Sequence, residues 1–168
     1  VSNCMNYAEV ELQNTRDISY SYLAGIVARN QKGLIQECVN EGNINSKNLP
    51  FAAGVVAENM GTVYGCINKG QVTSSKDYIG GMGASNLNNV HACYHTGTVK
   101  GYNLVAEITG NNAVAGEAEV IACYSTGTLT ANTVYGAVIG NNGEYGKATD
   151  CYYANSDRGI GGNSNNTE

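Results

Sequence analysis

A short segment recurs along this chain, and this recurrence constrains the fold more than any other feature. Residues 24–44 read AGIVARNQKGLIQECVNEGNI, and residues 53–72 read AGVVAENMGTVYGCINKGQV. Matching segments at a spacing of 28 or 29 residues predict a repeat architecture, in which each copy is one structural unit packed against its neighbours. The sequence is therefore more informative about the fold than about the function.

The six cysteines mark the units, because successive ones are separated by 34, 28, 27, 30 and 28 residues. We place the units at about 1–21 (partial), 22–48, 49–76, 77–101, 102–131 and 132–162, and we expect the polar residues 163–168 to form a loose tail. The first unit lacks its first half, so we expect the chain to be a fragment of a longer protein. The spacing lengthens at 5–20 and 112–117, where we expect loops.

Alignment of the units produces columns of like residues that are separated by variable positions. This pattern predicts strands with one face packed inward and the other exposed to water. We expect the glycine and asparagine columns at turns, where positive φ is required and asparagine side chains can hydrogen-bond along the stack. The columns are Val27, Val56, Gly83, Ile108 and Val138; Val1, Ile35, Val63, Val90, Val120 and Ala148; Ile44, Val72, Val99 and Leu129; Gly42, Gly70, Gly97 and Gly127; Asn30, Asn59, Asn86, Asn111 and Asn141; and the cysteines.

The length of the unit selects the geometry of the repeat. Each unit offers three short strand-like pieces and three turns, which fit one coil of a β-helix whose neighbours lie about 4.8 Å away. Composition agrees, because the chain has 22 glycines and glycine costs about 1 kcal/mol per helical position relative to alanine. We predict a single all-β domain, a right-handed parallel β-helix (β-solenoid) of about five coils. A flatter two-sheet β-solenoid or β-roll is the alternative.

Charge and hydropathy exclude two classes of partner. The net charge is −5 and the sequence has no basic run that would neutralise phosphates, so we expect no nucleic-acid partner. No apolar run has the length of a membrane-spanning helix, so we expect no membrane insertion.

The cysteine column has three interpretations. Equivalent residues of a parallel stack lie about 4.8 Å apart with parallel Cα–Cβ bonds, whereas a disulfide needs Cβ atoms about 3.8 Å apart. We therefore expect a column of buried free thiols, which pack as small apolar side chains. One or more disulfides are the alternative, and a metal cluster is disfavoured because no two cysteines have a Cys-x-x-Cys spacing.

The other candidates for chemistry carry weak signals. His91, Cys93 and His95 are spaced two residues apart, so on a strand all three could face the same side and bind a metal ion. Equivalent positions in other units, however, supply no further ligand. Residues 140–147 differ from a phosphate-binding loop in their glycine spacing. Glycan cleavage requires carboxylates that are aligned on adjacent coils, and the carboxylates of this sequence do not align in that way. We expect no enzyme and no catalytic, metal or cofactor-binding residue, and we assign no binding residue.

A tyrosine column is the main candidate for an exposed contact surface. Tyrosines there can stack on sugars or contact a protein, but we interpret them as a cover over the rim of the core. The column consists of Met5, Val39, Ile67, Tyr94, Tyr124 and Tyr152.

The repeats resemble the GLUG motif, whose pattern is similar to Gly-Gly-Ile-Val-Gly-x-Asn-x-Gly-x-Ile-x-x-Cys-Tyr-x-x-Gly-x-Val. Residues 24–44 and 53–72 match almost throughout, residues 80–99 match with Asn88 in place of a glycine, and residues 105–129 depart most. Such repeats occur in secreted and surface proteins of Gram-positive bacteria and gut anaerobes, including non-catalytic regions of immunoglobulin A1 metallopeptidases. This resemblance implies an extracellular β-solenoid segment without catalytic residues.

We therefore predict a non-catalytic structural spacer or adhesin stalk of a bacterial surface protein, located outside the cell or on its surface. The alternative is a module that binds a host glycan or protein through the side face of the solenoid. A polysaccharide-active β-helix enzyme is a third, less favoured class. The expected partners are the rest of the longer chain and, for the alternative, that glycan or protein. Unpaired strands at the ends of the stack also allow end-to-end self-association.

Overall fold

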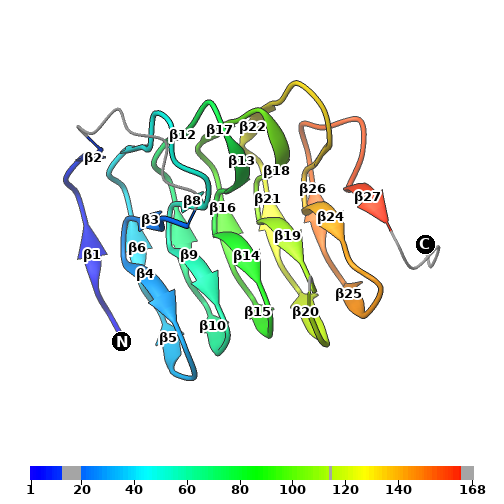
Figure 1. Ribbon diagram of the computed structural model, residues 1–168. Helices are drawn as coiled ribbons and strands as arrows, with labels where there is room; N and C mark the ends of the chain where they lie inside the picture. Colours follow the sequence, from blue (N-terminus) through cyan, green and yellow to red (C-terminus); the bar gives the residue numbers. More distant parts are fainter. Residues whose placement is uncertain (13–19, 114, 164–168) are drawn as a thin grey trace.

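The backbone winds through five short strands in each coil, and equivalent strands of successive coils pair in parallel (Figure 1). The computed structural model describes residues 1–12, 20–113 and 115–163. Regular secondary structure in these residues is entirely β-strand, so the predicted all-β parallel β-solenoid of about five coils is confirmed. The coils lie side by side, with β1 and β27 at opposite ends of the stack (Figure 1).

Five parallel sheets run along the stack, and we number them in the order in which a coil enters them. Sheet 1 contains β4 (Val27–Asn30), β9 (Val56–Asn59), β14 (Gly83–Asn86), β19 (Thr109–Asn112), β24 (Ile139–Asn142) and β27 (Ile160–Asn163). Sheet 2 contains β5 (Leu34–Gln36), β10 (Thr62–Tyr64), β15 (Asn89–His91), β20 (Ala118–Ile121) and β25 (Gly146–Thr149). Sheet 3 contains β1 (Met5–Asn6), β6 (Val39–Asn40), β11 (Ile67–Asn68), β16 (Tyr94–His95), β21 (Tyr124–Ser125) and β26 (Tyr152–Tyr153).

Sheets 4 and 5 complete each coil. Sheet 4 contains β2 (Val10–Glu11), β7 (Ile44–Asn45), β12 (Val72–Thr73), β17 (Thr98–Lys100) and β22 (Thr128–Thr130). Sheet 5 contains β3 (Leu23–Ala24), β8 (Ala52–Ala53), β13 (Asp77–Gly80), β18 (Asn103–Ala106) and β23 (Tyr135–Gly136). Among the described residues there is no helix of the length and apolar character needed to cross a membrane.

The expected three strands per coil and the alternative two-sheet solenoid are both wrong, because each coil has five strands. The predicted Leu-Ile-x-x-Cys-Val strand is divided between β5 and β6, where Glu37 adopts a φ of +53° and turns the chain. The equivalent residues Gly65, Ala92 and Ala122 have φ values of +60°, +50° and +50°. A separate strand, such as β8, also precedes five of the six strands of sheet 1, β27 being the exception.

The predicted register is confirmed for most columns and is wrong for one part of two units. The column from Ile35 to Ala148 pairs as predicted in sheet 2, and the column from Ile44 to Leu129 pairs as predicted in sheet 4. In sheet 1, however, the later coils are displaced by one residue from the predicted alignment. Thr109, Ile139, Asn112 and Asn142 take the places predicted for Ile108, Val138, Asn111 and Asn141.

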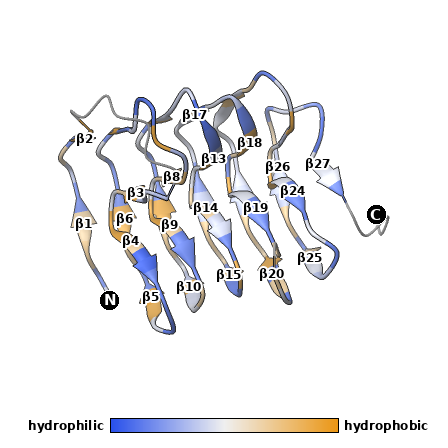
Figure 2. Cartoon of the chain, in the orientation of Figure 1, coloured by the Kyte–Doolittle hydropathy of each residue, from blue (hydrophilic) through white to orange (hydrophobic). Residues whose placement is uncertain are grey.

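The described residues contain two buried apolar clusters, each of which runs along the stack through successive coils. One joins sheets 1 and 2 to the cysteines, and the other joins sheets 4 and 5. Between them the chain passes close to the end of sheet 3, so that a Cβ added at Gly54 would lie 2.3 Å from the side chain of Asn68. Strands therefore carry both apolar and polar residues, as the mixed colours along them show (Figure 2).

Two ladders of amide side chains run along the stack. In sheet 1, each asparagine Nδ2 donates to the Oδ1 of the next coil over 2.8–2.9 Å, from Asn30 through Asn59, Asn86 and Asn112 to Asn142. In sheet 3, Asn6 donates to Asn40 and Asn40 to Asn68, each over 2.7 Å. A buried hydrogen bond contributes about 1 kcal/mol net, whereas an unsatisfied buried amide costs more, so the ladders favour this register.

The glycine column has a different physical cause from the predicted one. Gly42, Gly70, Gly97 and Gly127 do not adopt positive φ; instead, successive coils approach closely at this turn. A Cβ added at Gly97 would lie 2.2 Å from the carbonyl oxygen of Gly70, which is closer than real contacts allow. Close approach of backbones is thus the reason for this column.

Three predicted irregular segments are partly regular. Residues 5–20 include β1 and β2, where a loop was expected, and residues 13–19 lie outside the described residues. Residues 112–117 begin with the last residue of β19, and residue 114 is not described. In the expected loose tail, Asn163 ends β27, and residues 164–168 lie outside the described part of the chain.

Candidate functional site

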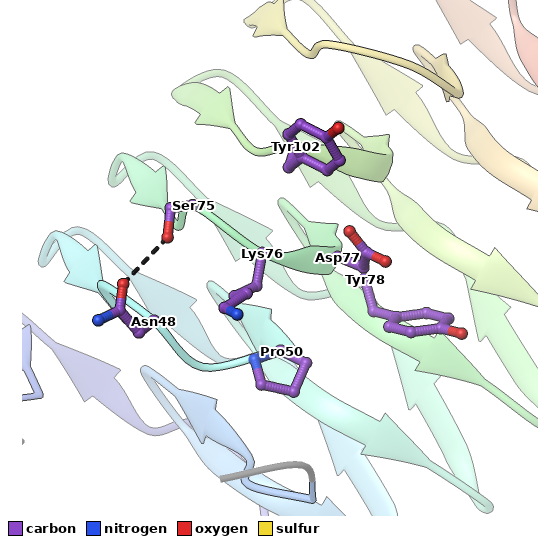
Figure 3. A pocket seen from close by; sticks show the side chains of 7 residues that line it. All are labelled: Asn48, Pro50, Ser75, Lys76, Asp77, Tyr78 and Tyr102. Carbon is purple, nitrogen blue, oxygen red and sulfur yellow. Dashed lines mark hydrogen bonds between the residues drawn. The ribbon is translucent and has the colours of Figure 1, made fainter. Parts of the chain in front are cut away.

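A pocket of about 630 Å³ opens where the connections that follow sheet 4 meet the start of sheet 5 (Figure 3). Three successive coils supply its walls, through the connections β7–β8, β12–β13 and β17–β18. Aromatic rings, hydroxyl and amide groups and one charge of each sign gather there. The lining residues are Asn48, Pro50, Ser75, Lys76, Asp77, Tyr78 and Tyr102.

Hydrogen bonds between coils hold the walls of this pocket. The Ser75 N–H donates to the carbonyl of Lys47 over 2.8 Å, and the Ser75 hydroxyl donates to Asn48 Oδ1 over 3.1 Å. One coil further, the Tyr102 N–H donates to the carbonyl of Lys76 over 3.1 Å. The pocket is therefore formed before any ligand arrives, which reduces the entropy cost of binding.

An aromatic ladder of three successive coils ends at Tyr78, which forms part of one wall. Phe51 stacks on Tyr78 with ring centroids 4.6 Å apart and planes 10° apart, and Tyr22 contacts Phe51 at 5.1 Å. Phe51 and Tyr78 have φ values of +57° and +61°, a conformation that costs a bulky residue on the order of 1–3 kcal/mol. Stacking between coils offsets this cost and fixes the direction of the Tyr78 ring.

Tyrosines also form a row on sheet 3. The rings of Tyr94 and Tyr124 stack in parallel, with centroids 5.2 Å apart, and Tyr152 pairs with Tyr124 in the next coil. Tyr124 and Tyr152 are exposed, at 42% and 67%. At these two positions the side chains lie on the outer surface and do not cover the core.

The cysteine column consists of free thiols in register, as expected. Cys38, Cys66, Cys93 and Cys123 are buried, and each thiol donates to the carbonyl oxygen two residues before it. Burial raises the pKa of the Cys38 thiol, and hydrogen bonds with Cys123 and Cys66, together with burial, raise that of Cys93. Hydrogen bonds with Cys93 lower the pKa of Cys66 to about 7, and hydrogen bonds with Cys151 and Cys93 lower the pKa of Cys123 to about 4. Burial shields all four thiols from solvent.

The histidines do not form a site with Cys93. Ala92 turns the chain between His91 and Cys93, so that His91 ends β15 while His95 lies in β16. In the described ranges no three His, Cys, Asp or Glu side chains are placed to hold a metal ion. Residues 140–147 form the end of β24, a turn and the start of β25, without the helix of a phosphate-binding loop.

His95 instead belongs to a buried polar cluster with Ser125 and Glu107. His95 Nδ1 lies 3.1 Å from Asn68 Nδ2 and so continues the sheet 3 ladder, and Ser125 is its partner in the next coil. The Ser125 hydroxyl donates to Glu107 Oε2. In the described part of the chain, His95 Nε2 and Glu107 Oε1 have no hydrogen-bond partner.

Burial sets the protonation of this cluster. It lowers the pKa of His95 to about 4, against the opposing effect of hydrogen bonds with the backbone of Asn68 and Gly97. It also raises the pKa of Glu107, although hydrogen bonds from Ser125 and from the backbone of Gly127 oppose the shift. His95 and Ser125 are fully buried and Glu107 is 1% exposed, so no substrate reaches this grouping of serine, histidine and glutamate.

Sequence reasoning missed the cluster because of the one-residue displacement in sheet 1. Glu107 follows Ala106, which pairs with Gly80, so Glu107 occupies the place of Gly81 in its own coil. A Cβ at Gly81 would lie 2.7 Å from the His95 ring, and in the next coil the smaller Ser125 makes room for the Glu107 side chain. Glu107 stands where the previous coil has Gly81, and Ser125 stands where the previous coil has His95. This linked pair of changes is the sequence signal that identifies the displacement.

Comparison of the chain with protein-family models, with curated protein sequences and with solved structures found no match.

Proposed function

We propose that this chain is a non-catalytic spacer or adhesin-stalk segment of a bacterial surface protein, located outside the cell. The observation that carries the proposal is the uninterrupted stacking of coils, with the sheet 1 ladder running from Asn30 to Asn142. In such a solenoid each coil contacts only its neighbours, so coil number sets the length. The bacterial and extracellular part of the proposal rests on the resemblance of the repeats to the GLUG motif.

The distribution of acidic groups supports a non-catalytic role. Glycan cleavage needs two carboxyl groups that face the same substrate. In the described residues, Asp77 is the single carboxylate that lines the pocket, and Glu107 is buried away from solvent. The partners proposed for the spacer are the rest of its longer chain and, through the ends of the stack, further copies.

Insertion of whole coils tests the spacer proposal. Three further copies of residues 53–79, placed after Ile79, preserve the register because Ile79 pairs with Ala52. We expect each copy to lengthen the molecule by about 4.8 Å, or about 14 Å in total, when the maximum dimension is measured by small-angle X-ray scattering. An insert of the same composition in scrambled order is the control and should add a flexible loop. A folded variant whose maximum dimension does not increase would contradict the proposal.

A second candidate function is binding through the side face, and the exposed aromatic groups favour it. Tyr102, Tyr124 and Tyr152 are 50%, 42% and 67% exposed. Tyr102 lines the pocket, whereas Tyr124 and Tyr152 lie on sheet 3, and exposed tyrosines are suited to contact with a glycan or a protein.

A further inference from the structure

We propose that the pocket between Pro50 and Tyr102 binds one or two sugar rings of a neutral glycan. This inference goes beyond the spacer function, does not depend on it, and gives the side-face alternative a defined site and ligand class. Four properties of the pocket support it: its aromatic surfaces, its polar groups, its rigidity and its size.

The aromatic surfaces match the apolar faces of a sugar ring. A pyranose ring presents C–H groups on its faces and hydroxyl groups around its edge, so it packs on a flat aromatic ring within reach of polar groups. Tyr102 is 50% exposed at the rim of the pocket, and Tyr78 forms part of its wall. Stacking on Phe51 and a φ of +61° hold Tyr78 in one direction.

The polar groups are suited to sugar hydroxyls. In Figure 3, Lys76 and Asp77 lie between Pro50 and Tyr102, and the hydrogen bond from Ser75 orients the amide of Asn48. Carboxylate and amide oxygens accept hydrogen bonds from hydroxyls, and amide and ammonium N–H groups donate to them. Among the described lining residues there is one positive and one negative side chain, so this part of the lining has no net charge, which disfavours phosphorylated ligands and favours a neutral one.

The size and rigidity of the pocket agree with a small ligand. Its volume of about 630 Å³ lies within the range of sites for small molecules. Its walls come from three coils joined by hydrogen bonds, so binding requires little ordering. A protein partner needs about 800 Å² of contact on each side, far beyond the pocket itself.

Titration calorimetry with three neutral tetrasaccharides (cellotetraose, mannotetraose and lacto-N-tetraose) tests the proposal. We expect at least one of them to bind, and Tyr102→Ala to weaken that binding by tenfold or more. Tyr64→Ala is the matched control, because Tyr64 is 49% exposed but lies on β10 in sheet 2, outside the pocket. We expect this control to change the affinity by less than twofold, and Asp77→Asn to weaken it by removing a charged acceptor.

Three outcomes would overturn the proposal: no binding of any tetrasaccharide, unchanged affinity in Tyr102→Ala, or equal losses in Tyr102→Ala and Tyr64→Ala. Circular dichroism melting shows whether each variant is folded, and the exposure of both tyrosines favours folding. The test is separate from that of the spacer function, because neither substitution alters the number of coils. A negative result here therefore leaves the scattering experiment unaffected.

Discussion

Replacement of Gly97 by alanine is expected to lower the free energy of unfolding by about 3 kcal/mol or more. The added Cβ would lie 2.2 Å from the Gly70 carbonyl oxygen and 2.8 Å from that of Lys69. Both are backbone atoms, so relief of the contact requires two coils to separate. Such separation weakens the hydrogen bonds between the coils and the packing on either side of the turn. Urea denaturation followed by circular dichroism measures the effect.

Gly83→Ala is the matched control for this substitution. Gly83 lies in β14, and an added Cβ would be 3.7 Å from the nearest atom, the carbonyl oxygen of Val56. We expect the free energy of unfolding to change by less than about 1 kcal/mol. An increase is the favoured direction, because alanine reduces the conformational freedom of the unfolded chain. Equal effects of Gly97→Ala and Gly83→Ala on the free energy of unfolding would contradict the conclusion that the coils approach closely at Gly97.

Acidification from pH 6.5 to 4 is expected to cost about 3 kcal/mol of stability through His95. Its pKa is lowered from 6.5 to about 4, so between these two pH values His95 is protonated in the unfolded chain and neutral in the folded chain. Each pKa unit corresponds to about 1.4 kcal/mol. The contribution is therefore fully present above pH 6.5 and is lost as the pH falls to about 4. Glu107 acts in the opposite sense, because its raised pKa favours the folded state on acidification.

His95→Asn isolates the contribution of the histidine. Asn40 and Asn68 already occupy the equivalent positions opposite Gly25 and Gly54, so the space for asparagine exists in this column. The new side chain should accept from Asn68 and continue the sheet 3 ladder. Glu107 remains in both proteins, so the difference between their stabilities at pH 7 and pH 4 reports on His95. Parallel pH dependence of the two proteins would show that His95 titrates normally in the fold.

The sequence was sufficient to predict the stacking of coils, since apolar columns such as that of Val63 and Val90 admit one register. It was insufficient where two registers are locally equivalent. Asn111 and Asn112 are adjacent, and either satisfies an asparagine column, so the choice depends on whether Glu107 has space inside the coil. The division of a predicted strand at Glu37 or Ala92 was also hidden, because positive φ at a residue other than glycine has no clear sequence signature.

The pocket could not be predicted for a related reason. Its residues lie mainly in connections between sheets 4 and 5, which differ in length and composition among the coils. Tyr78 continues the column of Tyr22 and Phe51, but Tyr102 belongs to no repeating column, and its proximity to Tyr78 follows from how each connection folds. The cysteine column, by contrast, was predicted together with its free thiols, because parallel stacking alone places the cysteines in line.

Mapping of thiol reactivity tests the in-register stack most directly. We expect iodoacetamide, applied to the native protein without reductant, to modify the exposed Cys4 and to spare Cys38, Cys66, Cys93 and Cys123, which are buried. After denaturation without reductant, mass spectrometry should find all six cysteines alkylated. Disulfides between column members, or rapid alkylation of Cys66 and Cys93 in the native protein, would contradict a continuous stack with these side chains in its core.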